Sequence, residues 1–181
     1  QLAVAGDRLY VANSGGMDYN TAVGYDNTLS VIDLGYFEEL EKLEVVLNPV
    51  SVVACGEYVF VASYGNYADV PSTLQCVDTR TGSVQVVEEC CNMTEFCYDG
   101  GVLYGYFSQY DENWNAVTTY LSYDVATGDV VSPWINESVL PVPYKLSTAG
   151  GFLCVTESDY LNDGDVYMYD RQGMLVAKVP S

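Results

Sequence analysis

The stretch NTLSVID (27–33) recurs three times along the chain in altered form, as STLQCVD (72–78), TTYLSYD (118–124) and GDVYMYD (164–170). Each copy is an apolar segment that ends in an aspartate and is followed by a turn. The closing aspartates lie at intervals of 45, 46 and 46 residues: Asp33, Asp78, Asp124 and Asp170. An interval this long and this constant indicates one supersecondary unit repeated four times.

Three further strands are predicted in each unit. An apolar strand lies upstream of every aspartate stretch, as RLYVA (8–12), YVFVA (58–62), VLYGY (102–106) and FLCVT (152–156). Each of these strands follows a glycine turn, and another short strand precedes that turn. A fourth strand follows the aspartate turn, which reads Asp-x-x-Thr-Gly in the second and third units. In the first unit we expect a connection over 34–41 and a strand over 42–47.

The strands are rich in β-branched and aromatic residues, and Gly, Asp and Asn separate them. The second and third strands of each unit are apolar on both faces, which is typical of a sheet packed between two others. Four antiparallel strands in a unit of this length form the blade of a β-propeller. The sequence therefore predicts an all-β chain, a β-propeller domain with four blades of four antiparallel strands, as part of a larger propeller. The blades are expected at about 1–47, 48–91, 92–140 and 141–181.

The first two units also resemble a known family. LYVAN (9–13), NTLSVID (27–33) and the Asn-Pro pair at 48–49 are similar to the YVTN-type (YncE-like) propeller repeat, and the last two units keep the framework without the wording. The resemblance implies a bacterial cell-envelope or secreted protein, commonly with more than four blades. It thus implies an extracytoplasmic location, at the periplasm or cell surface, with a lipoprotein as one form.

The number of blades leaves three arrangements open. Further blades could lie upstream of Gln1, which begins inside a strand pattern. The four blades could instead close into a ring, or two copies could complete a larger ring by end-to-end association. An open arc would expose two apolar sheet faces, which soluble proteins avoid.

Composition excludes several classes of function. Six Lys and Arg against 25 Asp and Glu give a net charge of −19, which repels the phosphates of nucleic acids. No apolar run is long enough to be inserted in a membrane. The chain has no histidine, and so lacks the usual general base and the commonest transition-metal ligand. We expect no cofactor and no catalytic residue.

The six cysteines do not indicate whether the protein folds in an oxidising or a reducing compartment. Cys55, Cys76 and Cys154 lie in apolar strand patterns, where small buried thiols are common. Cys90, Cys91 and Cys97 flank one repeat junction, where a disulfide and free thiols are both open alternatives.

Function is expected in the loops between the second and third strands, at 14–26, 64–71, 108–117 and 158–163. Aromatic rings beside carboxylates are suited to recognising a protein or a glycan. The candidate ligand-binding residues are Tyr19, Tyr67, Tyr110, Asp111, Trp114 and Tyr160. Calcium is an alternative ligand, but the acidic stretch 159–165 lacks the EF-hand spacing.

Three functions follow from these features. The first is a non-enzymatic extracytoplasmic propeller that binds a protein or glycan partner through its acidic, aromatic loop face. The second is a lyase or hydrolase, with acid–base work done by carboxylates of raised pKa such as Asp111 and Glu112. The third is a purely architectural part of a surface assembly. The repeated aspartates are expected to build turns, because a turn aspartate accepts backbone N–H groups two residues on.

Overall fold

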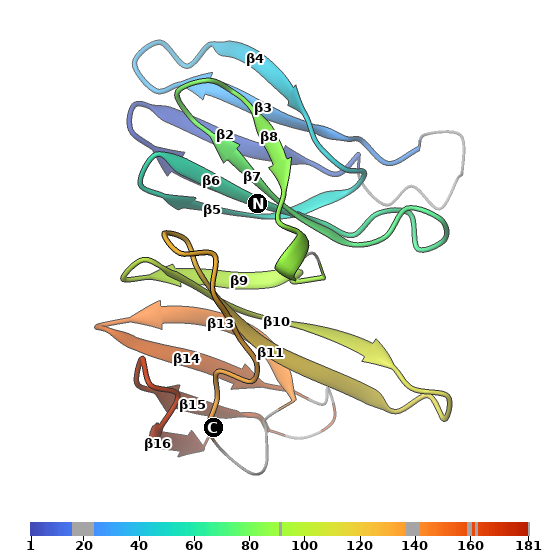
Figure 1. The fold of residues 1–181 in the computed structure, drawn as a ribbon, viewed down its shortest axis with the longest axis vertical. Helices are drawn as coiled ribbons and strands as arrows, with labels where there is room; N and C mark the ends of the chain where they lie inside the picture. The colour runs from blue at the N-terminus through green and yellow to red at the C-terminus, as the bar shows by residue number, and fades with distance from the viewer. Residues whose placement is uncertain (16–23, 91, 137–141, 159–160, 162, 181) are drawn as a thin grey trace. The chain divides into compact units, whose positions relative to one another are not determined.

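The structure is a computed structural model and describes residues 1–15, 24–90, 92–136, 142–158, 161 and 163–180. The described chain is all β apart from one 3-10 turn, η1 (Glu88–Cys90). It forms two compact units, Gln1–Thr94 and Glu95–Ser181, with two four-stranded sheets in each (Figure 1). No helix in this part of the chain is long and apolar enough to cross a membrane.

The first unit contains two sheets in which each strand pairs antiparallel with the next strand along the chain. The first sheet consists of β1 (Leu2–Ala5), β2 (Arg8–Asn13), β3 (Thr28–Asp33) and β4 (Glu39–Glu44). The second consists of β5 (Pro49–Cys55), β6 (Tyr58–Ser63), β7 (Thr73–Asp78) and β8 (Val84–Val86).

The second unit repeats this order. Its first sheet consists of β9 (Glu95–Asp99), β10 (Val102–Tyr110), β11 (Ala116–Asp124) and β12 (Val130–Val131). Its second consists of β13 (Pro143–Ala149), β14 (Phe152–Glu157), β15 (Asp165–Tyr169) and β16 (Leu175–Pro180). The predicted four blades of four antiparallel strands are confirmed.

The repeated aspartates close the hairpin between the third and fourth strands of each sheet. The Asp78 carboxylate accepts hydrogen bonds from the backbone N–H groups of Arg80 and Thr81, at 2.8 and 3.3 Å. Asp124 does the same for Ala126 and Thr127, at 2.9 and 3.0 Å. Equivalent bonds are made by Asp33 and Asp170. The prediction that these residues build turns is confirmed, since each satisfies the backbone donors of its own turn.

The first sheet corrects one predicted element. We expected a connection over 34–41 and a strand over 42–47, but β4 begins at Glu39 and ends at Glu44. Asp33 makes this early start, because its carboxylate accepts hydrogen bonds from Gly35 and Tyr36, both at 2.8 Å. The turn is then complete by Phe37, and Glu39 pairs with Ile32.

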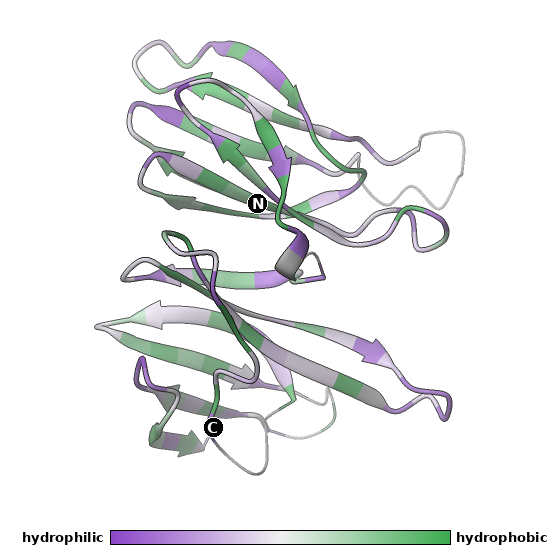
Figure 2. Cartoon of the chain, in the orientation of Figure 1, coloured by the Kyte–Doolittle hydropathy of each residue, from purple (hydrophilic) through white to green (hydrophobic). Residues whose placement is uncertain are grey.

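The core of the first unit is mainly aliphatic, with one tyrosine. Tyr10, Leu29 and Val31 of the first sheet pack against Val52 and Val59 of the second. Figure 2 shows the hydrophobic residues along β6 and the more hydrophilic character of the outer strand β4. Packing of one sheet on the next, largely through valine side chains, holds the two blades of the first unit together.

The core of the second unit is built around an indole. Trp134 meets the rings of Tyr104, Tyr120 and Tyr169 edge to face, with centroids 5.4, 5.7 and 5.8 Å away. Its Nε1 donates a hydrogen bond to the Gly105 carbonyl at 3.1 Å. Edge-to-face pairs contribute about 0.5–1.5 kcal/mol each beyond burial, and the indole N–H is satisfied. Trp134 thus fixes the groove described below.

Candidate functional site

A two-stranded ribbon extends beyond the other strands of its sheet in the second unit (Figure 1). β10 and β11 are paired over nine residues, from Val102–Asp124 to Tyr110–Ala116. β9 pairs with β10 only as far as Tyr106, and β12 pairs with β11 only at Ser122 and Tyr123. The end of this hairpin, which we call the aromatic ribbon (107–119), is therefore supported by neither outer strand.

The aromatic ribbon corrects the predicted loop at 108–117. Ser108 faces Thr118 across the hairpin, and their hydroxyl oxygens lie 2.9 Å apart. The loop shrinks to 111–115, because polar residues such as Thr118 are good strand formers when a partner strand is beside them.

Two large aromatic side chains lie at the tip of the ribbon. Tyr110 and Trp114 are 69% and 81% exposed, and their ring centroids are 6.1 Å apart. Trp114 has a φ of +62°, in the left-handed region that costs a bulky residue about 1–2 kcal/mol. A strained backbone position of this kind makes Trp114 a candidate for a functional role.

Asp111 sets the geometry of the tip. Its Oδ1 accepts hydrogen bonds from the backbone N–H groups of Asn113 and Asn115, both at 2.8 Å, and the Asn115 side-chain amide donates to Oδ2 at 3.0 Å. The Asn115 side chain and these backbone donors hold the pKa of the Asp111 carboxyl below its usual range. The raised pKa expected for a catalytic Asp111 is wrong, since every one of these donors favours the ionised form.

A second group of aromatic rings lies in the first unit. The Tyr67 ring is 6.2 Å from the rings of both Tyr25 and Tyr64, and we call these three residues the tyrosine cluster. Tyr67 is exposed and also lies in the left-handed region, with a φ of +58°. The cluster joins loops that follow the second strands of two neighbouring blades.

The loop that carries Tyr67 is held by its own hydrogen bonds. The Asn66 side-chain oxygen accepts from the N–H groups of Ala68 and Val70, and the Asn66 amide donates to Asp69 at 2.8 Å. A Cβ on Gly65 would lie 2.0 Å from the Val70 carbonyl oxygen, so the loop closes tightly on itself. The Asn66 side chain also holds the pKa of Asp69 below its usual range. Tyr67 is therefore presented by a preorganised loop.

The structure brings some of the predicted residues together and leaves others apart. Tyr110, Asp111 and Trp114 share the tip of the aromatic ribbon, whereas Tyr67 belongs to the tyrosine cluster of the other unit. The predictions for Tyr19 and Tyr160 fall outside the described residues.

The described residues contain no group of three or more Cys, Asp or Glu side chains that could hold a metal ion. Residues 159, 160 and 162 of the acidic stretch lie outside them, as does Cys91. The Cys97 thiol is free and buried, and burial raises its pKa to about 12. Such a thiol is protonated and unreactive at neutral pH.

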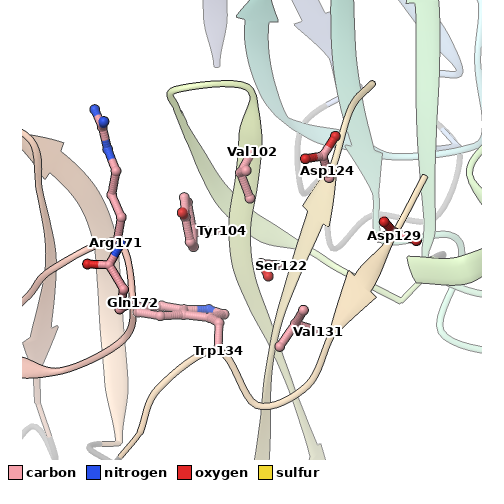
Figure 3. A pocket seen from close by; sticks show the side chains of 9 residues that line it. All are labelled: Val102, Tyr104, Ser122, Asp124, Asp129, Val131, Trp134, Arg171 and Gln172. Carbon is pink, nitrogen blue, oxygen red and sulfur yellow. The ribbon is translucent and has the colours of Figure 1, made fainter. Parts of the chain in front are cut away.

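A groove of about 270 Å³ lies in the second unit, away from the loops in which the sequence predicted a site. It separates the sheet of β9, β10, β11 and β12 from the turn between β15 and β16, and the Trp134 ring lies at its base (Figure 3). Its principal residues are Val102, Tyr104, Ser122, Asp124, Trp134 and Arg171. Two of them are buried residues that carry a hydroxyl: Tyr104, which belongs to the core, and Ser122. Comparing equivalent positions of the four repeats could have revealed this groove, because Ser122 stands where the first repeat has Val31.

The first unit also has a groove, but its charges are already paired. A groove of about 290 Å³ lies between the glycine turns of the first two sheets. Its Arg80 is already paired with Glu57 at 3.1 Å and with Asp78 at 3.0 Å. These surface pairs neutralise the groove and contribute little to stability.

No protein-family model matches the sequence, and no curated protein matches it. Solved structures do match. Hydrazine synthase of Kuenenia stuttgartiensis is 15% identical with a TM-score of 0.68, over 99% of this chain and 48% of that one. TolB from Acinetobacter baumannii is 14% identical with a TM-score of 0.64, over 99% and 42%. A chain of the nidogen/laminin complex is 9% identical with a TM-score of 0.64, over 98% and 62%.

These likenesses show the fold. TolB and the nidogen/laminin match are β-propeller proteins, so the four-stranded sheets described above are propeller blades. The chain spans less than two thirds of the length of each of the three matched chains. At such low identity the likeness carries no activity from one protein to another.

Proposed function

We propose that the chain is part of a non-enzymatic, extracytoplasmic β-propeller of the YVTN type that binds a protein partner. The aromatic ribbon is the observation that carries the proposal. The ribbon extends beyond its sheet and carries two exposed rings, and aromatic residues contribute much of the binding energy of protein interfaces. Propellers have a general binding role, and one matched structure is a complex between two proteins.

Charge supports a basic partner. The low pKa of Asp111 keeps a negative charge beside Trp114 at neutral pH, and the whole chain carries −19. A partner with basic residues around an apolar pocket would be attracted by this field and would accept the indole. The tyrosine cluster offers a second surface of the same chemistry in the first unit.

The test starts with affinity capture of proteins from an extract of the source cells, followed by direct binding measurements with the purified partner. Trp114→Ala is expected to weaken binding by about 30-fold or more, as truncation of an interface hot spot does. Phe37→Ala is the matched control, because Phe37 is also exposed and has a φ of +56° in the turn before β4. Equal loss in both variants, or capture of glycans alone, would overturn the proposal.

A second variant separates binding from folding. Trp114→Gly relieves the left-handed strain at about 1–2 kcal/mol but adds the backbone entropy of glycine, about 0.5–1 kcal/mol. The melting temperature is therefore expected to stay the same or rise, while partner binding is lost. A protein that becomes less stable and keeps its partner would show that Trp114 serves the fold instead.

A further inference from the structure

The groove in the second unit is lined by two mostly buried side chains that carry a hydroxyl group. Tyr104 is 6% exposed and Ser122 is 7% exposed, and both line the groove. No hydrogen bond joins either hydroxyl to another described residue, and neither oxygen is sealed from solvent. Figure 3 shows Tyr104 projecting from β10 into the space beside the 171–172 turn. Both oxygens are open to the groove, so water satisfies them when the groove is empty and a ligand donor can take the place of that water.

The first unit shows how the same position is closed in another repeat. Tyr10 pairs with Val31 in the register in which Tyr104 pairs with Ser122. There Tyr10 is only 1% exposed; its burial raises the phenol pKa, and a hydrogen bond from the Arg8 side chain lowers it. The second unit has Val102 at the position of Arg8, so the donor is missing, and a second hydroxyl replaces a valine. The groove is thus a specific departure from the repeat.

The charges around the groove favour a cation. Asp124 and Asp129 both line it, and two backbone donors from Thr127 and Ala126 hold the pKa of Asp124 below its usual range. The positive charge of Arg171 is already used, because its Nε donates to the Asp99 carboxylate. With Asp99, Asp124 and Asp129 against Arg171, the local charge is negative. An anionic ligand is therefore disfavoured.

We infer that this groove binds a primary alkylammonium group, such as a lysine side chain or a small amine. An ammonium has three N–H donors and no acceptor. The Tyr104 hydroxyl, the Ser122 hydroxyl and the Asp124 carboxylate provide three acceptors on one wall of the groove. The apolar stem of the ligand would lie against Val102 and the Trp134 ring, as the alkyl part of lysine does on other apolar surfaces. The site is separate from the aromatic ribbon, so it goes beyond the proposed protein binding.

Fluorescence of Trp134 provides the readout. The chain has two tryptophans, so Trp114→Phe leaves Trp134 as the sole indole. This background would be titrated with N-acetyl-lysine methylamide, with n-butylammonium and with the uncharged N-acetyl-norleucine methylamide. Saturable binding of both amines and none of the norleucine compound is expected. Equal binding of the two amines identifies the alkylammonium as sufficient, and tighter binding of the lysine compound identifies a peptide source.

Three variants test the site with little risk to the fold, and two of them copy a residue of the first repeat. Ser122→Val reproduces Val31, and Tyr104→Phe removes the other hydroxyl. Each is expected to weaken binding about tenfold, because hydrogen bonds to a charged group are among the stronger ones. Val102→Arg reproduces Arg8 and is expected to abolish binding by filling the groove with a resident cation.

Circular dichroism and melting of each variant would show that the fold is kept. Binding of the norleucine compound at the same affinity would overturn the inference. So would unchanged amine binding in Val102→Arg, or no saturable change with either amine in the folded parent.

Discussion

An aspartate closes a β-hairpin because its carboxylate accepts the two backbone N–H groups that the turn leaves without partners. Asp78 and Asp124 do this in their sheets, and Asp111 does it again at the tip of the aromatic ribbon. The residue after the turn is often a glycine with positive φ, such as Gly128 and Gly173. At this scale the same chemistry recurs, and only its surroundings change.

Gly128 and Gly173 have similar backbone geometry but different neighbouring atoms. Gly128 and Gly173 have φ values of +79° and +76°. A Cβ on Gly173 would lie 1.8 Å from the Trp134 carbonyl oxygen, whereas a Cβ on Gly128 would meet no described atom within 4 Å. Gly128→Ala should cost about 1–2 kcal/mol of unfolding free energy from backbone strain alone. Gly173→Ala should cost more than about 3 kcal/mol, because main chain must also move.

Urea unfolding of the two variants at neutral pH checks this difference. Equal losses of unfolding free energy would contradict it, and would mean that the Gly173 turn can shift away from Trp134 at little cost.

Residue patterns predict local features better than grooves. The turn aspartates could be predicted because each acts on backbone atoms only two to four residues away. The groove could not be predicted from one segment, because Tyr104 and Ser122 meet only through strand register and Arg171 comes from another sheet. Its pattern becomes visible only after the repeats are compared position by position.

At the scale of elements, the sequence defines the ends of the strands less sharply than their order. Polar residues after Phe107 resemble a loop, but they pair across the hairpin as far as Tyr110 and Ala116. The order and type of the strands were predictable, because apolar periodicity and glycine turns are strong local signals. The length of the aromatic ribbon was not, because cross-strand pairing decided it.

The Asp111 turn should control the order of the ribbon tip. Asp111→Ala removes the acceptor for Asn113 and Asn115, while Asp111→Asn keeps a side-chain oxygen in the same place. Amide hydrogen exchange around Tyr110 should become faster in the alanine variant and change little in the asparagine variant. Partner binding is expected to weaken in the alanine variant and to change little in the asparagine variant, because an ordered tip holds Trp114 in place for the partner.

Hydrogen exchange followed by mass spectrometry of peptides covering the tip would provide the measurement. Equal protection in both variants would show that cross-strand pairing alone orders the ribbon. Loss of a turnover reaction in Asp111→Asn, with the tip still ordered, would instead favour the enzymatic alternative.

At the scale of the whole molecule, one face of the first sheet has no cover among the described residues. Its side chains lie opposite the buried Tyr10 and Val31, and they include the exposed Leu2 and Val4. The corresponding side chains of the second sheet, Val52 among them, are buried against the first. An apolar sheet face of this kind is a surface for another blade. The two predicted sources of that blade are a further part of the chain and a second copy of it.

A chain of these 181 residues should therefore associate with itself as its concentration rises. The double variant Leu2→Glu, Val4→Glu should weaken association at least tenfold, because it places charges in the contact. Tyr36→Glu is the control, since Tyr36 is also exposed but lies in the turn between β3 and β4 and not in a strand of that face. Sedimentation velocity between low and high micromolar concentration would measure the effect. A monomer at every concentration, or equal effects of both changes, would contradict the prediction.

The strict succession of the strands also bears on how the protein is made. In every sheet each strand pairs with its immediate successor, so the sheet that begins at Leu2 is complete by Glu44. A ribosome releases the chain in that same order, and no described strand has to wait for a partner synthesised much later. The strands of each blade can therefore pair as they emerge, which limits the time during which a bare strand edge is open to a neighbouring nascent chain.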